Sequence, residues 1–201
     1  MKNNLGLYGV LPDIKDEEML IYMVKQSIKA GIKIIQYRNK TSKTSEIKNI
    51  AQKLCNICQK QGVLFIVNDR VDLASEINAD GVHIGGDDIS IEKAREILED
   101  KIIGVSCYGD ISRAKEMQEK GADYIAFGAV FTSPTKPKAK SINLDILKTK
   151  FDIPVCVIGG ISSGNIWKLK EYNIDMYAVI TDIYKDKNIS ENIRRLKNAI
   201  I

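Results

Sequence analysis

Short apolar stretches rich in β-branched residues alternate along the chain with longer amphipathic stretches. Alternation with a period of two predicts strands, whereas apolar residues three and four positions apart predict helices. Eight strands are predicted, at residues 5–11, 33–37, 63–67, 81–84, 102–106, 124–127, 154–158 and 176–181. Eight helices are predicted in the intervening and following segments, at residues 17–30, 44–61, 71–77, 91–98, 111–120, 144–150, 164–172 and 190–200. The chain therefore repeats a strand–helix unit eight times.

This repeat predicts the fold class. Strands that alternate with helical crossovers run parallel to one another. Eight such units over residues 1–201 predict an α/β fold, a (β/α)8 TIM barrel of one domain, at the short end of the size range for that fold. An open, doubly wound parallel sheet is the alternative. The dinucleotide fingerprint G-x-G-x-x-G is absent after the first predicted strand, which favours the closed barrel.

Composition and charge exclude several protein classes. The chain is 44% hydrophobic and 28% charged, as in ordinary globular proteins, which excludes collagen, disorder and a disulfide scaffold. Its formal charge is +4, from 30 basic and 26 acidic residues spread along the chain, and this small excess argues for neither a nucleic-acid nor a membrane partner. No stretch approaches the ~18–20 apolar residues of a membrane span, and the N-terminus lacks the pattern of a secretory signal. We therefore expect a cytoplasmic protein.

Cysteine and histidine content limits the metal chemistry that the chain can support. Cys55 and Cys58 form a CxxC inside a predicted helix, without the second pair that a zinc site needs, so they are interpreted as helix residues. The chain has a single histidine, which excludes a histidine-rich metal site. That residue, His83, lies within the fourth predicted strand and is interpreted as a packed polar residue.

Polar residues follow the second predicted strand, at the barrel end where active sites lie. Alternation places Gln36, Arg38 and Lys40 on one side of the chain, so that two cations and an amide converge. A guanidinium fork and an ammonium charge together suit phosphate oxygens. A solvated loop tip is the alternative interpretation.

Acidic residues follow the third and fourth predicted strands. Asp69 lies at one strand end, and Asp87 and Asp88 lie at the next. Carboxylates at adjacent strand ends could share a Mg²⁺ ion, which takes one or two carboxylates together with water and substrate phosphate. Helix capping by Asp69 and Asp87 is the alternative, and it does not exclude metal binding.

A second anion site is predicted across the barrel mouth. The irregular segment 130–143 carries Ser133, Thr135 and Lys136, and Gly160 follows the seventh predicted strand. Glycine lets backbone N–H groups approach a phosphate, and a phosphate site after strands seven and eight recurs in this fold. No paired Ser/His nucleophile is evident. The chemistry indicated is the positioning and charge stabilisation of a phosphorylated leaving group.

The ordered motifs together resemble the thiamine-phosphate synthase family over nearly the whole chain. The matching strings, in chain order, are Gln36-Tyr37-Arg38-Asn39-Lys40, Asn68-Asp69-Arg70-Val71-Asp72-Leu73-Ala74, Ala79-Asp80-Gly81-Val82-His83-Ile84-Gly85, Asp88, Gly104-Val105-Ser106, Phe127-Gly128-Ala129-Val130-Phe131, Ser133-Pro134-Thr135-Lys136 and Ile158-Gly159-Gly160-Ile161. Each string is weak alone, but eight ordered matches at the expected strand ends are specific.

The resemblance implies an activity and a set of site residues. The family joins hydroxymethylpyrimidine diphosphate to hydroxyethylthiazole phosphate and releases diphosphate before the thiazole nitrogen captures the pyrimidine cation. The implied metal ligands for Mg²⁺ are Asp69 and Asp88, and the implied catalytic residues are Arg38, Lys40, Ser106 and Lys136. The implied substrate-binding residues are Gln36, Tyr37, Arg38, Asn39, Lys40, Asn68, Ser106, Ser133, Pro134, Thr135, Lys136, Gly160, Ile180 and Thr181. The family also suggests a homodimer whose only other partners are these small-molecule substrates.

Some positions depart from the family pattern. Gly86 stands where glutamine is usual, Cys107-Tyr108 where a small residue and histidine are common, Thr132 where proline is frequent, and Thr181 where serine is frequent. The alternatives are a thiazole tautomerase, an unrelated phosphate-binding barrel, and an idle protein that binds the thiazole or pyrimidine phosphate. Tautomerases resemble the synthases but lack the second metal aspartate and use a histidine near the fifth strand. The presence of Asp88 and the absence of a histidine after Ser106 favour the synthase.

Overall fold

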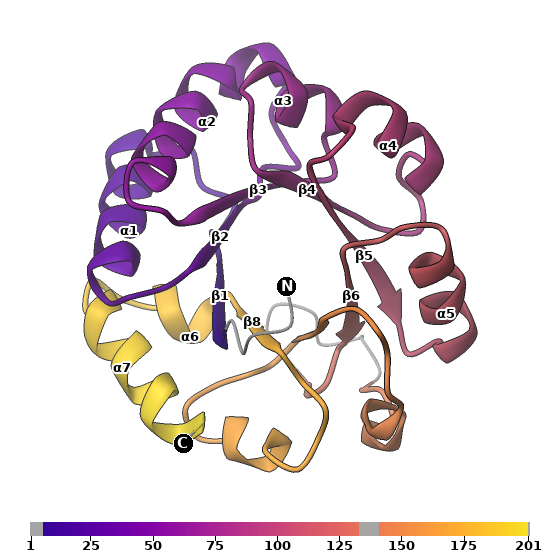
Figure 1. Ribbon diagram of the computed structural model, residues 1–201. Coiled ribbons are helices and arrows are strands. Elements are labelled where there is room, and N and C mark those ends of the chain that lie inside the picture. The colour runs from indigo at the N-terminus through magenta and orange to yellow at the C-terminus, as the bar shows by residue number, and fades with distance from the viewer. Residues whose placement is uncertain (1–5, 133–140, 201) are drawn as a thin grey trace.

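Eight parallel strands close into a barrel in the computed structural model, which describes residues 6–132 and 141–200 (Figure 1). The strands are β1 (Gly6–Val10), β2 (Ile34–Tyr37), β3 (Leu64–Asn68), β4 (Gly81–Ile84), β5 (Ile102–Tyr108), β6 (Tyr124–Gly128), β7 (Val155–Ile158) and β8 (Met176–Val179). Each strand pairs with its neighbours in chain order, and β8 pairs with β1 to close the ring. The predicted closed barrel is confirmed, and the open sheet is excluded.

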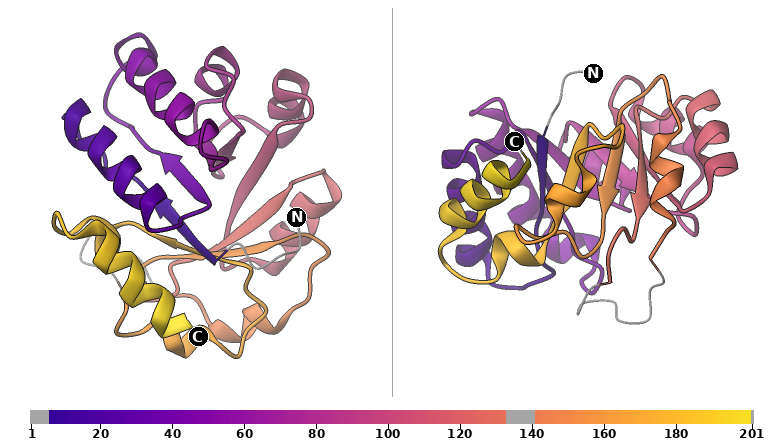
Figure 2. Two further views of the ribbon diagram at one scale, coloured as in Figure 1. Left: turned by 60° about the vertical axis from the view of Figure 1, so that its left-hand side comes forward. Right: turned by 90° about the horizontal axis from the view of Figure 1, so that it is seen from below.

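Helices surround the strands on the outside of the ring (Figure 2). They are α1 (Glu17–Lys29), α2 (Thr44–Gln59), α3 (Val71–Glu76), α4 (Ile91–Leu98), α5 (Ile111–Glu119), α6 (Thr181–Tyr184) and α7 (Ile189–Ile200), with the 3₁₀ turns η1 (Leu144–Lys148) and η2 (Ile166–Leu169). The two α-helices predicted at 144–150 and 164–172 are wrong in type, because these segments form only single 3₁₀ turns. The eighth strand was predicted too long, since it ends at Val179 and Thr181 begins the short helix α6.

Alternation along the strands divides the core into two layers. The inner layer fills the barrel and consists of Tyr8, Val10, Ile34, Ile66, Tyr124, Ala126, Cys156, Met176 and Ala178. The outer layer lies between strands and helices and includes both thiols of the CxxC, Cys55 and Cys58, which are fully buried. Burial raises the pKa of the Cys55 thiol to about 11. These cysteines are therefore core residues of α2, as interpreted from the sequence.

Three aspartates anchor the strand starts at the opposite end of the barrel from the predicted site. Each lies just before an even-numbered strand and accepts a hydrogen bond from the backbone N–H at the start of the preceding odd-numbered strand. The bonds run from Phe65 N to Asp80, from Ile103 N to Asp123 and from Val155 N to Asp175, at 2.8, 2.8 and 2.9 Å. A charged acceptor satisfies a backbone donor that the parallel ladder leaves unpaired at its end. These hydrogen bonds therefore help to hold the paired strands in register at the end of the barrel where the strands begin.

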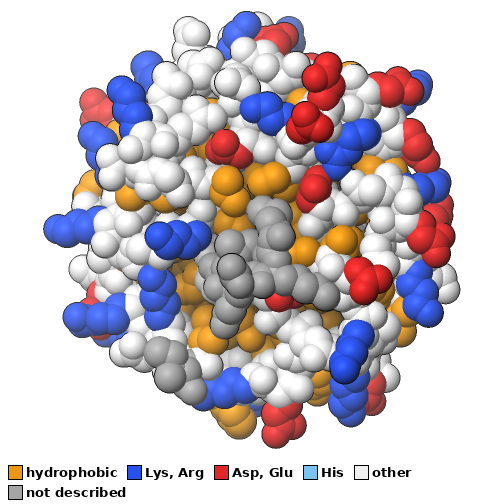
Figure 3. Space-filling view, in the orientation of Figure 1, with side chains coloured by type: hydrophobic (Ala, Val, Ile, Leu, Met, Phe, Trp, Pro, Cys, Tyr) orange, Lys and Arg blue, Asp and Glu red, His pale blue; other side chains and the backbone are white. Residues whose placement is uncertain are grey.

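The surface shows no helix suited to a bilayer. Within residues 6–132 and 141–200, no helix is long and apolar enough to cross a membrane. Basic and acidic side chains both line the outer rim of the face in Figure 3, and apolar side chains gather nearer its centre.

The ring of Tyr124 on β6 occupies space that a glycine on the neighbouring strand β5 leaves open. Gly104 pairs with Tyr124 across β5 and β6, and a Cβ built on Gly104 would lie 1.9 Å from the Tyr124 ring. No side chain other than hydrogen fits there while the ring keeps its place. Gly104 thus directs the Tyr124 hydroxyl into the barrel interior.

We predict that Gly104→Ala destabilises the fold by about 1–3 kcal/mol, the usual cost of overpacking a core. Urea unfolding followed by circular dichroism measures the loss. Gly164→Ala is the control, because its nearest atom would lie 3.8 Å from the added Cβ. Equal stability of the two variants would contradict the packing argument.

Candidate active site

The ends of β2, β3 and β4 bring one cation and two carboxylates together. Lys40 Nζ lies 2.8 Å from Asp69 Oδ2. Burial and the neighbouring charge of Asp69 raise the pKa of the Asp88 carboxyl, against a hydrogen bond from Gly85 N that lowers it. Two carboxylates this close repel each other unless a proton or a cation lies between them. The group is therefore suited to binding a cation.

Neither Asp69 nor Asp87 caps the helix that follows it. The residue that precedes α3 is Arg70, and no side chain caps that helix. Ser90 caps α4, its hydroxyl accepting from Lys93 N at 3.4 Å. Asp69 has φ 64°, a left-handed conformation that costs free energy in a non-glycine residue. The capping alternative is thus not realised at Asp69 or Asp87.

Asp88 is held in place by its own loop. Its Oδ2 accepts a hydrogen bond from Gly85 N at 2.7 Å. The neighbouring Gly86 N donates to the hydroxyl of Tyr108 at 2.8 Å, and a Cβ on Gly86 would lie 3.0 Å from that hydroxyl. Gly86, in the loop after β4, and Tyr108, at the end of β5, therefore form one compensated pair of a small and a large residue. Two departures from the family pattern have a common structural cause.

Asp13, in the loop after β1, organises the loop that carries the cations. Its carboxylate lies 3.7 Å from Arg38 Nη1 and accepts from the backbone N of Lys40 at 3.0 Å. The Thr41 hydroxyl lies 3.5 Å from the other carboxylate oxygen. Sequence reasoning missed Asp13, although its position just after the first strand places it at the same end of the barrel. Asp13 is a positioning residue for Arg38 and Lys40.

Asn68 ends β3 with an unpartnered amide. Its Nδ2 is buried and, within the part of the chain that the structure describes, has no hydrogen-bond acceptor. Leaving a buried N–H donor unpaired costs about 1–3 kcal/mol. Ile66, two residues earlier on the strand, belongs to the inner layer, so alternation directs Asn68 towards the barrel mouth. The amide is available to a ligand oxygen there.

A chain of hydrogen bonds crosses the barrel from β2 to β5. Gln36 Nε2 lies 2.8 Å from the Tyr8 hydroxyl, which lies 3.1 Å from the Tyr124 hydroxyl. The latter lies 2.9 Å from His83 Nδ1, and His83 Nε2 lies 2.9 Å from Ser106 Oγ. Desolvation lowers the pKa of His83 to about 4, so the ring is neutral at pH 7. The structure thus links Gln36 and Ser106, two residues predicted to bind substrate.

The contact between His83 and Ser106 changes one argument from the sequence. The absence of a histidine after Ser106 favoured a synthase over a tautomerase, yet the barrel brings the single histidine of the chain to Ser106 from the adjacent strand β4. Sequence reasoning interpreted His83 as a packed polar residue and did not connect it with Ser106. A sequence signal existed, because His83 and Ser106 both lie near the carboxyl ends of neighbouring strands.

The predicted phosphate site at β7 and β8 is partly described. A Cβ on Gly160 would lie 2.4 Å from the Thr132 carbonyl oxygen, so the chain after β6 packs directly on this glycine, whose φ is 65°. Asn165 Nδ2 donates to the Gly160 carbonyl at 2.8 Å. Ile180 packs against the inner layer and precedes Thr181, the first residue of α6. Gly160, Ile180 and Thr181 therefore follow adjacent strands at one end of the barrel.

Two of the residues predicted to bind substrate direct their side chains elsewhere than the barrel mouth. Tyr37 lies in the outer layer and stacks on Phe65, with ring centroids 6.4 Å apart. The Asn39 side chain accepts from Ser42 N at 2.9 Å and closes a turn in its own loop. Alternation sends the Tyr37 side chain to the other face of β2, and the turn uses the Asn39 oxygen, so substrate binding by these two residues stays a prediction. The residues Ser133, Pro134, Thr135 and Lys136 lie outside the described residues.

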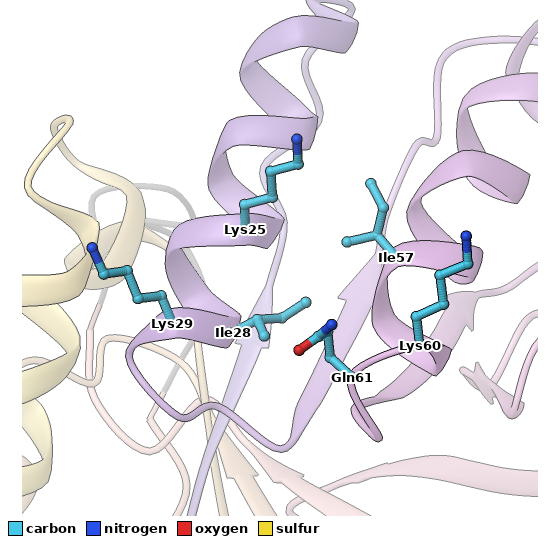
Figure 4. A pocket seen from close by; sticks show the side chains of 6 residues that line it. All are labelled: Lys25, Ile28, Lys29, Ile57, Lys60 and Gln61. Atoms are coloured by element: carbon cyan, nitrogen blue, oxygen red, sulfur yellow. The ribbon is translucent and has the colours of Figure 1, made fainter.

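A surface pocket of about 410 Å³ lies elsewhere, between the last turns of α1 and α2 (Figure 4). Lys25, Ile28 and Lys29 line it from α1, Ile57 lines it from α2, and Lys60 and Gln61 line it from the turn that follows α2. The helices end at the side of the barrel where the strands begin. The pocket is thus remote from the carboxylates, and the Lys29 side chain extends away from it.

Comparison with known proteins identifies the family. The family model described as thiamine monophosphate synthase matches residues 7–183. A thiamine-phosphate synthase of Wolinella succinogenes is 44% identical over 89% of this chain and 85% of its own length, and one of Methanobrevibacter smithii is 41% identical over 94% of both chains. The chain belongs to the thiamine-phosphate synthase family.

Solved structures agree with this assignment. The thiamine phosphate pyrophosphorylase of Pyrococcus furiosus superposes with a TM-score of 0.86 and 33% identity, over 98% of this chain and 96% of that chain. A 3-hexulose-6-phosphate synthase superposes with a TM-score of 0.72 over 97% of this chain and 99% of that chain. At 17% identity this second likeness shows the shared barrel alone.

Proposed function

We propose that the protein transfers the hydroxymethylpyrimidine group from its diphosphate to hydroxyethylthiazole phosphate, with Mg²⁺, giving thiamine phosphate and diphosphate. One observation carries the proposal. The paired carboxyls of Asp69 and Asp88 lie beside Lys40 at three adjacent strand ends, in a chain of the synthase family. A divalent cation and a diphosphate together supply the charges that complement this group.

The residues present fit Mg²⁺. Its preferred ligands are carboxylate oxygens, and it is held by one or two of them together with water and substrate phosphate. Among the described residues no cluster of three or more His, Cys, Asp and Glu side chains could hold a metal ion. Water and substrate oxygens would therefore complete the shell around Asp69 and Asp88. Mg²⁺ bound there would neutralise charge on the departing diphosphate.

The surrounding side chains complement a diphosphate. Arg38 and Lys40 supply positive charge from one loop, and Asp13 holds both in position. The unpartnered Asn68 amide supplies a hydrogen-bond donor that a phosphate oxygen would satisfy. Donors that are already oriented stabilise developing negative charge without reorganising at the moment of reaction. These groups would favour departure of diphosphate over retention of the C–O bond.

The barrel interior suits the pyrimidine ring. Gln36 and Ser106 present polar atoms near the mouth, and the inner apolar layer lies beneath them. A carbocation formed after diphosphate leaves reacts readily with water, so a dry floor protects it until the thiazole nitrogen arrives. Gly160, Ile180 and Thr181 would receive the thiazole phosphate, together with residues outside the described ranges. The cytoplasmic location and the homodimer stay predictions.

The tautomerase alternative has one observation in its favour, the contact between His83 and Ser106. Both ring nitrogens of His83 are engaged, by Tyr124 and Ser106, and desolvation lowers the pKa of His83 to about 4, so at pH 7 the ring is neutral and no imidazolium is present to act as an acid. The two carboxylates have no role in such a reaction. The synthase therefore explains more of the site.

We predict that the purified protein forms thiamine phosphate from the two substrates only when Mg²⁺ is present. Chromatographic detection of thiamine phosphate, with and without a chelator, measures this. Absence of product at high enzyme concentration would refute the synthase, and conversion of one thiazole phosphate isomer into another would establish the tautomerase instead.

We predict that Asp69→Asn and Asp88→Asn each raise the Mg²⁺ concentration needed for half-maximal activity by at least about tenfold, because each removes one anionic ligand. Asp87→Asn is the matched control, since it removes the same charge from the neighbouring position. An equal effect of all three substitutions would point to overall charge rather than ligation. Unchanged Mg²⁺ dependence in Asp69→Asn and Asp88→Asn would overturn the metal assignment.

We predict that Asp13→Asn raises KM for the pyrimidine diphosphate about tenfold and leaves KM for the thiazole phosphate unchanged, because Arg38 and Lys40 lose their common anchor. Steady-state kinetics with each substrate varied in turn measures the split. If Asp13 acts through Arg38, its substitution adds little in an Arg38→Ala background, as expected for coupled residues. Full additivity of the two substitutions would exclude positioning through Arg38.

A further inference from the structure

The hydrogen-bonded chain across the barrel has a direction that follows from the chemistry of its members. An amide N–H₂ group only donates, a hydroxyl donates one proton and accepts others, and a neutral imidazole donates from one nitrogen and accepts at the other. The five members are Gln36, Tyr8, Tyr124, His83 and Ser106. Once the first donor is known, each remaining proton has one place to go.

The assignment of donors and acceptors begins with Gln36 on β2. Gln36 Nε2 donates to the Tyr8 oxygen, so the Tyr8 proton must find another acceptor. Tyr8 is 1% exposed, and the second hydrogen bond of its hydroxyl among the described residues is to the Tyr124 hydroxyl. The reverse assignment would bury the Tyr8 proton without a partner, which is costly. Tyr8 therefore donates to Tyr124.

The same reasoning assigns the protons from Tyr124 to Ser106 at the barrel mouth. Tyr124 is 2% exposed, accepts from Tyr8 and must donate its own proton to His83 Nδ1. A neutral ring that accepts at Nδ1 carries its proton on Nε2, which donates to Ser106 Oγ. Ser106 has thus filled an acceptor position, and its own proton is left to point away from His83. Ser106 is partly exposed, so that proton is available to a ligand.

We propose that this chain sets the hydrogen-bond polarity that the mouth offers to the pyrimidine ring: Ser106 donates to a ring nitrogen, and Gln36 Oε1 accepts from the exocyclic amino group. This inference rests on the proposed function for the identity of the ring. His83, Tyr124 and Tyr8 do not touch the substrate in this scheme and are positioning residues, since they act through Ser106 and Gln36.

The chain gives the site selectivity as well as position. A ring with an acceptor nitrogen on the β5 side and an amino donor on the β2 side satisfies both ends. A ring with a carbonyl in place of the amino group would set an acceptor against Gln36 Oε1, and accommodating it would require the amide to turn. Such a turn would remove the Nε2 donor from Tyr8 and reverse every bond of the chain. Polarity at the two ends is therefore linked.

The single histidine of the chain makes the direction directly measurable. In protein labelled with ¹⁵N-histidine, the ring signals of His83 report which nitrogen carries the proton. At pH 7 we expect one neutral tautomer with the proton on Nε2. A tautomer with the proton on Nδ1 would overturn the proposal, because it requires the reversed chain and an acceptor at Ser106. This measurement needs no turnover, so it stands or falls separately from the synthase activity.

Two matched variants test the role of the chain in positioning. Tyr124→Phe removes the proton donor that keeps Nδ1 unprotonated, so we expect a mixture of tautomers and about a tenfold higher KM for the pyrimidine diphosphate. KM for the thiazole phosphate should not change. Tyr8→Phe leaves Tyr124, His83 and Ser106 connected, so the His83 spectrum should match that of the unsubstituted protein. Identical spectra for the two variants would overturn the proposal, and circular dichroism confirms that both fold.

Substrate analogues test the bond to Ser106. We expect Ser106→Ala to weaken binding of the pyrimidine diphosphate about tenfold, and to cost nothing for the pyridine analogue in which the relevant ring nitrogen is replaced by C–H. Isothermal titration with each of the two pyridine analogues identifies that nitrogen. An equal loss for the pyrimidine and both pyridines would show that Ser106 does not donate to a ring nitrogen. If the protein binds none of these compounds, the proposed function fails, while the tautomer result remains valid.

Discussion

Closure of eight parallel strands into a ring is the constraint on which the rest of this structure depends. A closed ring has one interior, and every second side chain of every strand must enter it. The interior is narrow, so large residues on one strand need small ones opposite, as Gly104 accommodates the Tyr124 ring. The same alternation brings polar residues inward at the strand ends. The site is therefore a consequence of the closure.

Polar atoms inside the ring must be paired, and this requirement connects the two substrate-facing residues. Tyr8 and Tyr124 are buried in an otherwise apolar layer, where an unpaired hydroxyl is costly. Their hydroxyls pair with each other and with Gln36 and His83. The polar network at the mouth thus continues the inner core. Above it, Asp13 and Asp69 tie the cationic loop to strands on either side.

The structure explains two of the departures from the family pattern together, those at Gly86 and Tyr108. Gly86 and Tyr108 lie 22 positions apart, yet the Tyr108 hydroxyl accepts a hydrogen bond from Gly86 N and occupies the space beside it. A larger side chain at position 86 would displace that ring. The pair keeps the loop of Asp88 supported. Thr132 touches Gly160 through its backbone, so its side chain is not what packs there.

Local pattern alone was enough to predict eight strand–helix units, their order and the barrel, because periodicity depends only on neighbouring residues. It also predicted that Gln36, Arg38, Lys40, Asp69 and Asp88 lie at one end of the barrel, as they do in the structure. It overestimated the helices after β6 and β7, since the one-turn lengths there depend on packing. Strand-end positions indicate that Asp13 and Arg38, and likewise His83 and Ser106, share one end of the barrel, but they do not show which side chains meet. These partners lie 25 and 23 positions apart, and only closure of the ring brings them together.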